Sequence, residues 1–259
     1  MIMIRSLWTW TAVTVLIVVW LPLLAVVRLI DRDPARYRTG LWFRRLGCLL
    51  TRVNPSWRVT VSGVRIEDPR RPYLVVSNHQ SLADIPVISC LPWEMKWVAK
   101  EELFRLPVVG WQMRLAGDIE VNRSDSRSGA RALMAARAYL QKHCSVMFFP
   151  EGTRSRDGSV GRFSEGPFRL AIKAQVPVLP LVIEGTRDAL PKHSWRFGEP
   201  STIRLSVLQP VSTAALSPND AAALTAQVRQ RIEEELAAWR DADESSEHNE
   251  PAIVEPPYE

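Results

Sequence analysis

The chain has 259 residues, of which 46% are hydrophobic, and a formal net charge of +5. This length is enough for one large core or two small ones, and we expect one domain with appendages. Residues 241–259 contain seven acidic residues and no Lys or Arg, so residues 1–240 carry a charge of +12. A body this basic favours anionic surfaces such as phosphates or acidic lipids. Its N-terminal arginines lie beside a long apolar segment and form no helix-turn-helix pattern, which argues against nucleic acid as a partner.

The cysteines indicate which kinds of cross-link to expect. Cys48, Cys90 and Cys144 are odd in number and widely spaced. This pattern argues against a disulfide framework and against a zinc site, and it fits a reducing compartment. We therefore expect no disulfide and no bound metal.

The first feature along the chain is an uncharged run from Leu7 to Val27, which is long enough to cross a hydrocarbon core. It is too long for the apolar part of a signal peptide and has no small-x-small cleavage site, so we expect it to be retained. Arg5 precedes the run and six arginines follow it by residue 45. The positive-inside rule therefore predicts that the rest of the chain lies in the cytoplasm. Pro22 and three tryptophans leave open a bent or interfacial helix pair, and a buried soluble helix is the third alternative.

Residues 41–53 combine arginines with bulky apolar residues at helical spacing. This pattern is typical of an interfacial helix, although packing against a core explains it nearly as well. We take residues 1–53 as membrane-anchoring helices.

The remainder alternates between predicted strands and predicted helices. The strands are expected at residues 57–63, 73–77, 96–100, 117–123, 145–149, 176–183 and 201–209. The helices are expected at residues 81–90, 107–115, 128–142, 168–174 and 217–239. This order predicts an α/β fold with a mixed, largely parallel sheet flanked by helices, in which reactive groups gather at the carboxyl ends of strands. Residues 241–259 have too little apolar content to fold and are expected to be disordered.

The strand at residues 73–77 leads into His79, and Asp84 follows five residues later. Positions i and i+5 lie about 140° apart on a helix, so the two side chains meet only if His79 precedes the helix. Ser81 as N-cap, with Asp84 at N3, gives that geometry. Asp84 would then orient the imidazole of His79 as a general base. The alternative is a capped helix beside a histidine without a chemical role.

A second polar turn follows the strand at residues 145–149. Glu151, Gly152, Thr153 and Arg154 place a carboxylate, a flexible backbone and a guanidinium together. Arginine suits phosphate recognition, and glycine lets backbone amides approach an anion. The alternative is a surface turn with an ion pair.

Four ordered signatures resemble those of the glycerolipid acyltransferase family, most closely the bacterial 1-acyl-sn-glycerol-3-phosphate acyltransferases. They are Asn-His-Gln-Ser-Leu-Ala-Asp at 78–84, the segment 117–123, Phe-Pro-Glu-Gly-Thr-Arg-Ser at 149–155, and Val-Pro-Val-Leu-Pro at 176–180. The resemblance covers roughly residues 55–210, and we take residues 54–240 as the catalytic domain. The first and third signatures together are highly specific.

The resemblance implies a role for each candidate residue. His79 would take the proton from the free hydroxyl of a lysolipid, with Asp84 orienting it, and the alkoxide would attack an acyl thioester without an acyl-enzyme. Arg154, Arg123 and Lys100 would hold the phosphate. Glu151 would hydrogen-bond the glycerol or position Arg154, and backbone amides near Gly152 and Thr153 would stabilise the oxyanion. No metal or cofactor is implied.

The resemblance also implies the partners: a lysophospholipid in the membrane and acyl-CoA or acyl carrier protein as donor, at the cytoplasmic face of a bacterial inner membrane. The chain departs from the family pattern at two places. Glu120 stands where an aromatic is usual, and residues 163–167 (Phe-Ser-Glu-Gly-Pro) replace Phe-Lys-x-Gly. These departures leave open a different lysophospholipid or an amino-acid lipid as acceptor. A catalytically silent lipid-binding adaptor is the third hypothesis, and the intact His79 and Asp84 argue against it.

Overall fold

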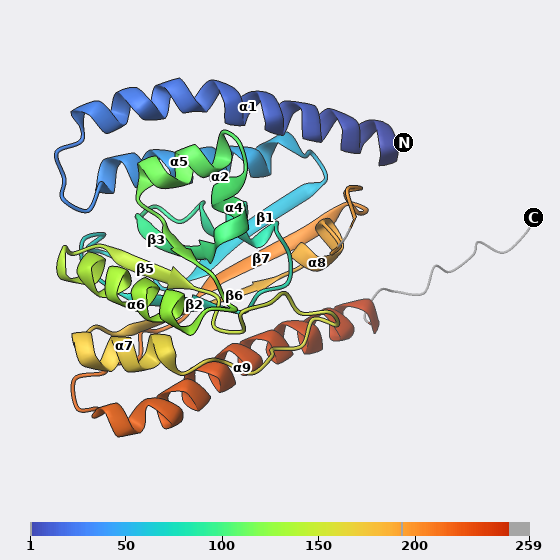
Figure 1. Ribbon diagram of the computed structural model, residues 1–259. Coiled ribbons are helices and arrows are strands. Elements are labelled where there is room, and N and C mark those ends of the chain that lie inside the picture. The colour runs from blue at the N-terminus through green and yellow to red at the C-terminus, as the bar shows by residue number, and fades with distance from the viewer. Residues whose placement is uncertain (1, 193, 249–259) are drawn as a thin grey trace, which may run out of the picture.

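The computed structural model describes residues 2–192 and 194–248. Its centre is a seven-stranded sheet in the order β1-β7-β6-β2-β5-β3-β4 (Figure 1). All neighbouring strands pair in parallel except β6 and β7, which are antiparallel. The prediction of a mixed, largely parallel sheet flanked by helices is therefore confirmed.

Each predicted strand and helix has a counterpart in the structure, whereas the short helices at Glu101–Arg105 and Thr186–Ala189 were not predicted. The strands are β1 (Trp57–Gly63), β2 (Leu74–Ser77), β3 (Met95–Lys100), β4 (Ile119–Val121), β5 (Ser145–Phe148), β6 (Val178–Glu184) and β7 (Ser201–Val207). The helices are α1 (Ile2–Ile30), α2 (Tyr37–Val53), α3 (Asp84–Ile88), α4 (Glu101–Arg105), α5 (Val109–Ala116), α6 (Ser126–Gln141), α7 (Gly166–Ala174), α8 (Thr186–Ala189) and α9 (Ala221–His248). A 3₁₀ helix, η1 (Pro218–Asp220), precedes α9, and Ser217 caps it.

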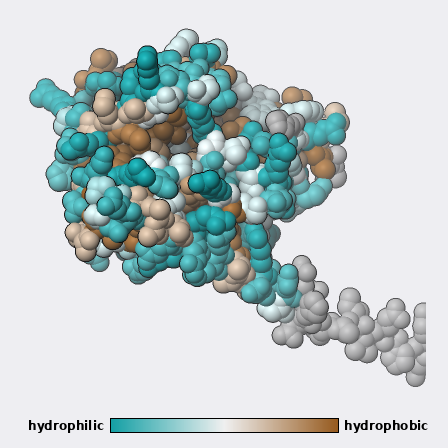
Figure 2. All heavy atoms as spheres, turned by 60° about the horizontal axis from the view of Figure 1, so that its bottom comes forward, coloured by the Kyte–Doolittle hydropathy of each residue, from teal (hydrophilic) through white to brown (hydrophobic). Residues whose placement is uncertain are grey.

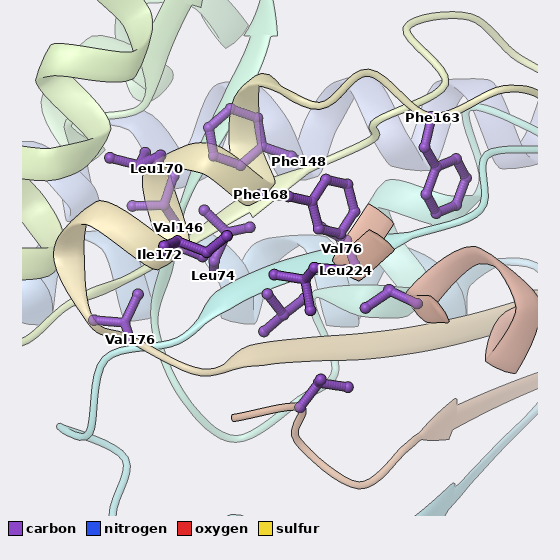
Figure 3. Packing of buried hydrophobic residues seen from close by; sticks show 14 of the residues in the cluster. Leu74, Val76, Val146, Phe148, Phe163, Phe168, Leu170, Ile172, Val176 and Leu224 are labelled. Carbon is purple, nitrogen blue, oxygen red and sulfur yellow. The ribbon is translucent and has the colours of Figure 1, made fainter. Parts of the chain in front are cut away.

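The central strands are buried on both faces because helices cover the two sides of the sheet. Every residue of β2 and β5 is buried, which is the reason for their continuous apolar runs. On one face, α6, α7 and α9 enclose a core that includes Val76, Phe148 and Phe168 (Figure 3). Figure 2 brings the α9 side of the molecule forward, and hydrophilic residues dominate that surface.

The opposite face carries a second apolar core and a buried charge cluster. Arg44 of α2 pairs with Asp118 at 2.5 Å, and Lys96 pairs with Glu94 at 2.8 Å. Lys96 also donates to the carbonyl of Ala116. Removing one member would leave its partner charged and buried, at a cost of about 3 to 5 kcal/mol. The cluster therefore fastens α2 to the sheet.

The N-terminal helices lie side by side against the second face (Figure 1). Arg5 donates to the carbonyl of Gly198, Gln112 donates to that of Ile17, and Leu24 is fully buried. Since these contacts are spread along α1, the whole helix follows the body of the domain. By length and composition, helix α1 could cross a membrane. In its most apolar stretch of 18 residues, 11% of the residues are buried.

The expectation about cysteines was wrong. Cys48 of α2 and Cys90, just beyond α3, form a disulfide, with their Cα atoms 4.5 Å apart. Gly47 makes this possible, since a Cβ there would lie 2.7 Å from the side chain of Ser89. The sequence gives no sign that the two helices come so close. The argument for a reducing compartment loses its support.

Two helix boundaries also differ from the predictions. Helix α3 begins at Asp84 and follows Ala83, so Ser81 is not its N-cap and Asp84 is its first residue. Helix α9 continues to His248, so the expected disorder from residue 241 is wrong for residues 241–248. Arg204 contributes to this extension by pairing with Asp243 at 2.6 Å. Residues 249–259 of the expected tail lie outside the described residues.

Candidate active site

The site begins where β2 ends, in the middle of the sheet. The amide of Asn78 donates to the carbonyl of Ile183 at 2.8 Å and accepts from its N–H at 2.9 Å. This pair of bonds fixes the end of β2 to the end of β6. It sets the direction in which the chain leaves the sheet, and therefore the position of His79.

His79 and Asp84 meet as the sequence predicts. Nδ1 of His79 lies 2.7 Å from Oδ2 of Asp84, and the Asp84 side chain is fully buried. The same oxygen accepts from the backbone N–H groups of Gln80 and Ser81 at 2.7 and 3.0 Å. The other oxygen of Asp84 accepts from the hydroxyl of Thr186 at 2.5 Å. The carboxylate thus faces four donors, which is how a buried charge is stabilised.

The ring of His79 is also held from its face. Phe149 stacks on it with ring centroids 3.9 Å apart and planes at 16°. Trp97 in turn contacts Phe149, at 5.8 Å between centroids. With the ring edge fixed by Asp84 and the ring face fixed by Phe149, the orientation of Nε2 is fixed as well.

Glu151 holds the backbone of the turn that follows β2 and contains His79, here called the catalytic turn. One of its oxygens accepts from the N–H of His79 at 2.8 Å, and the other accepts from the N–H of Gly161 at 2.9 Å. Burial raises the pKa of Glu151, although these two bonds act in the opposite direction. The expected positioning of Arg154 by Glu151 is not among the contacts of the described residues. Glu151 bonds to His79 because the turn after β5 and the turn after β2 leave neighbouring strands of the sheet.

The turn after Glu151 presents backbone N–H groups. Gly152 adopts a φ of +72°, which favours glycine, and its N–H donates to the carbonyl of Phe149. That N–H is therefore occupied, contrary to the expectation for an oxyanion site. The N–H groups of Thr153 and Arg154 have no acceptor in the described part of the chain. Ser155 then returns to the site by donating to the carbonyl of His79 at 2.8 Å.

The three candidate phosphate ligands differ in their surroundings. Arg154 is half-buried, and its guanidinium has no ion-pair partner among the described residues. Arg123 donates to the carbonyl of Gly152, and burial lowers its pKa. Lys100 is exposed and pairs with Glu102 at 2.6 Å. The structure thus brings Arg154 and Arg123 to the turn at Gly152, while Lys100 interacts with its own neighbour.

Two cavities flank the stacked rings. One, of about 400 Å³, lies against α6 and α7 and is lined by Arg123, Phe149, Glu151 and Gly152. The other, of about 170 Å³, lies between α2, α3 and α5, and its lining is mainly apolar and includes Trp97 and Ile85. The larger cavity has polar groups at Arg123 and Glu151 among mainly apolar residues, and Glu151 bonds the backbone of His79. The smaller cavity reaches Trp97, which contacts the Phe149 ring stacked on His79.

The free cysteine is a buried thiol. Burial raises the pKa of the free Cys144 to about 12, so its sulfur is a thiol and a poor nucleophile. Across residues 2–192 and 194–248, no group of three or more His, Cys, Asp or Glu side chains is arranged to hold a metal ion. The absence of a metal or cofactor stays a prediction.

The fold and the site together define an α/β protein with a carboxylate-oriented histidine at the end of a central strand. A family model described as acyltransferase matches residues 58–184. The structure resembles the crystal structure of the 1-acyl-sn-glycerophosphate acyltransferase PlsC from Thermotoga maritima, with a TM-score of 0.78 and 30% identity, covering 92% of this chain and 96% of that one. The chain belongs to the acyltransferase family.

Two curated relatives extend the comparison. A 1-acyl-sn-glycerol-3-phosphate acyltransferase of Pseudomonas aeruginosa is 28% identical over 250 residues, covering 96% of this chain and 93% of that protein. The chloroplastic LPAT1 of Arabidopsis thaliana is 32% identical over 180 residues, covering 69% of this chain and 50% of that protein. The chain spans about half the length of the plant and algal relatives it matches. The bacterial relative and the apolar α1 indicate association with a membrane.

Proposed function

We propose that this protein is a 1-acyl-sn-glycerol-3-phosphate acyltransferase. It would move a fatty acyl group from acyl-CoA or acyl carrier protein to the free hydroxyl of 1-acyl-sn-glycerol 3-phosphate, giving phosphatidic acid in phospholipid synthesis. The observation that carries this proposal is the His79–Asp84 pair, at 2.7 Å, next to the Glu151 turn that lines the larger cavity. The names of the relatives support the same substrate.

The chemistry starts with a proton transfer. Asp84 accepts from Nδ1 of His79 and so keeps that nitrogen protonated, which leaves Nε2 with a lone pair. Nε2 removes the proton of the acceptor hydroxyl as its oxygen attacks the thioester carbonyl. The tetrahedral intermediate collapses, the C–S bond breaks, and the departing sulfur takes the proton from His79. Oxygen replaces sulfur on the acyl carbon, and no acyl-enzyme forms.

The turn at residues 151–154 supplies the remaining groups. The unoccupied N–H of Thr153 is the proposed donor to the oxyanion, because the N–H of Gly152 is already bonded to Phe149. Arg154 and Arg123 provide positive charge beside Gly152 for the phosphate, and the larger cavity, which Arg123 and Glu151 line, has room for the glycerol phosphate. We assign the smaller cavity to an acyl chain.

The direct test uses the purified full-length chain in detergent micelles with labelled acyl-CoA, labelled acyl carrier protein and a panel of lysolipids. We expect transfer to 1-acyl-sn-glycerol 3-phosphate, and transfer about 10²- to 10⁴-fold slower with the His79→Ala variant. Which donor is used follows from the same assay. Lipid binding without transfer to any acceptor would favour the silent adaptor and refute the proposal.

One observation supports a second class of acceptor lipid. Glu120 is exposed on β4, so this departure from the family pattern does not reach the site. Ser164, however, lines the larger cavity at the position where the family pattern has lysine. The cavity therefore lacks one cation, which would suit another lysophospholipid or an amino-acid lipid. Preference for such an acceptor in the panel assay would establish this alternative.

The proposed location is the cytoplasmic face of a bacterial inner membrane. Its support is the run of arginines that follows α1, including Arg32, Arg36 and Arg38. Both donors are cytoplasmic molecules, which agrees with this side. Protease accessibility of residues 241–259 in sealed inverted vesicles, compared with spheroplasts, would test the orientation.

A further inference from the structure

The carboxylate of Asp84 has two oxygens, and they differ in how they are held. Oδ2 accepts from Nδ1 of His79 and from the backbone N–H groups of Gln80 and Ser81. Oδ1 accepts only from the hydroxyl of Thr186 among the described residues. Rotation of the carboxylate about its Cβ–Cγ bond would move both oxygens together. The bond at Oδ1 therefore opposes the rotation that would break the bond at Oδ2.

Thr186 is placed for this contact by the backbone before it. It is the first residue of α8 and fully buried, and it follows Gly185, which has a φ of +86°. A Cβ at Gly185 would lie 2.2 Å from the carbonyl oxygen of Thr202. Only glycine fits there, and the turn it makes directs the next residue toward Asp84 from the end of β6. The two bonded side chains are 102 positions apart in the sequence.

We propose that Thr186 is a positioning residue of the reaction, which holds Asp84 in the rotamer that orients His79. Thr186 contacts neither substrate and acts only through the carboxylate of Asp84. The inference names a further residue for the proposed acyl transfer. Its kinetic test therefore rests on the proposed function. Its electrostatic effect on His79 is independent of the substrate.

The hydroxyl also has a predictable electrostatic effect. By donating to Asp84 it takes up part of the negative charge that would otherwise stabilise the protonated imidazole of His79. Without the hydroxyl, Oδ2 keeps its three donors, and the charge of the carboxylate acts more strongly on the imidazole. Glu151, the other carboxylate facing His79, bonds its backbone N–H and is unchanged by the substitution.

The test compares Thr186→Val, which removes the hydroxyl and keeps the shape, with Thr186→Ser, which keeps the hydroxyl. For Val we expect kcat to fall about 10- to 100-fold, in the range of a misplaced catalytic group, with the KM values little changed. The acid limb of kcat/KM should move to higher pH. Ser should restore both properties. If Val does not fold, the pair Thr186→Ala and Thr186→Ser isolates the hydroxyl, because both lack the γ-methyl group.

Two outcomes would overturn the inference. One is a Val or Ala variant with a lowered melting temperature but normal kcat and an unmoved acid limb, which describes a purely structural threonine. The other is an unmoved NMR titration of His79 in the free variant protein. This second measurement needs no substrate, so it tests Thr186 even if the wild-type chain transfers no acyl group. Inactive wild-type protein would refute the proposed function and leave the NMR result to decide on Thr186.

Discussion

At the scale of single residues, the site is a histidine whose freedom has been removed from three directions. Asp84 fixes one edge of the ring of His79, Phe149 covers its face, and Glu151 holds its backbone N–H. The contacts leave Nε2 as the ring nitrogen available to a substrate. Preorganisation of this kind lowers the entropy cost of reaching the transition state.

The two members of the central pair have unequal roles, and substitutions can separate them. His79→Ala removes the base and should lower kcat by about 10²- to 10⁴-fold with little change in substrate binding. Asp84→Asn should also lower kcat by orders of magnitude, because the negative charge that stabilises the protonated imidazole is lost. The double variant should be scarcely worse than His79→Ala, since nothing remains to be oriented.

The melting temperature provides the control for this prediction. In Asp84→Asn the amide oxygen can take the place of Oδ2, and the amide nitrogen can face the hydroxyl of Thr186, which is free to turn and accept. We therefore expect the melting temperature to stay near that of the wild type. Full activity of Asp84→Asn would show that Asp84 only stabilises the turn before α3.

Arg154 is the guanidinium near the site that lacks a protein partner, as far as the described residues show. Arg154→Ala should raise the KM of the phosphate-bearing acceptor about 10- to 150-fold, the equivalent of a charge-assisted hydrogen bond, with a much smaller effect on the donor. Arg156→Ala, at an exposed position two residues later, is the matched control. Equal losses toward both substrates would indicate a structural role for Arg154.

The residues that the sequence could predict are those that lie close together in it. His79 and Asp84 are five positions apart, and Glu151 to Arg154 are consecutive, so a short pattern contains each group. Thr186 contacts Asp84 from 102 positions away, and no local pattern marks it. The role of Glu151 was missed for the same reason, because its partner His79 is 72 positions earlier.

At the scale of secondary-structure elements, α9 contributes to the site from a distance. Arg229 donates to the carbonyls of Val160 and Gly161, each at 3.0 Å. Gly161 in turn donates its N–H to Glu151, which holds His79. Arg240, further along α9, bonds the carbonyl of Gly158. The helix thus holds the loop that supports the catalytic turn.

This arrangement predicts that Arg229→Met lowers activity without touching a substrate. The loop would lose two hydrogen bonds from a charged donor, Glu151 would lose its fixed partner, and kcat should fall about 10- to 100-fold. The matched control is Arg231→Met, because Arg231 lies on the same helix and makes no hydrogen bond to this loop in the described structure. Steady-state kinetics and melting temperature of both variants check this. If the two behave alike, α9 does not act on the site.

The elements that sequence patterns describe best are those whose packing is repetitive. Strand β1 has its predicted bounds, and α6 differs from its prediction by two residues at its start. Prediction fails where one tertiary contact decides the outcome. The Cys48–Cys90 disulfide depends on the close approach at Gly47, and the extension of α9 includes the pair between Arg204 and Asp243. Neither contact leaves a periodic signal.

At the scale of the whole molecule, α1 exposes much of its apolar surface, and two of its four buried residues are polar. Ser6 and Thr9 are buried against the domain, whereas Val15, Val19 and Leu29 are 54%, 62% and 85% exposed. Its 29 residues span about 43 Å, and the domain follows them along this length. A helix attached in this way presents its apolar side outward along one face of the molecule. The exposed apolar residues of α1 are therefore suited to contact with lipid.

Because α2 is fixed by the buried pair of Arg44 and Asp118, deleting residues 1–53 would damage the domain as well as any anchor. A cleaner test replaces Val15 and Val19, on the exposed side of α1, with Glu. The double variant should bind liposomes about 10-fold more weakly or worse, since apolar area is lost and two charges must enter the interface. Its melting temperature in detergent should be unchanged, because neither side chain packs on the domain. Met134→Glu, which changes a 68% exposed apolar residue on α6, is the control and should bind normally. Undiminished, salt-resistant sedimentation of the α1 variant with liposomes would show that another surface anchors the protein.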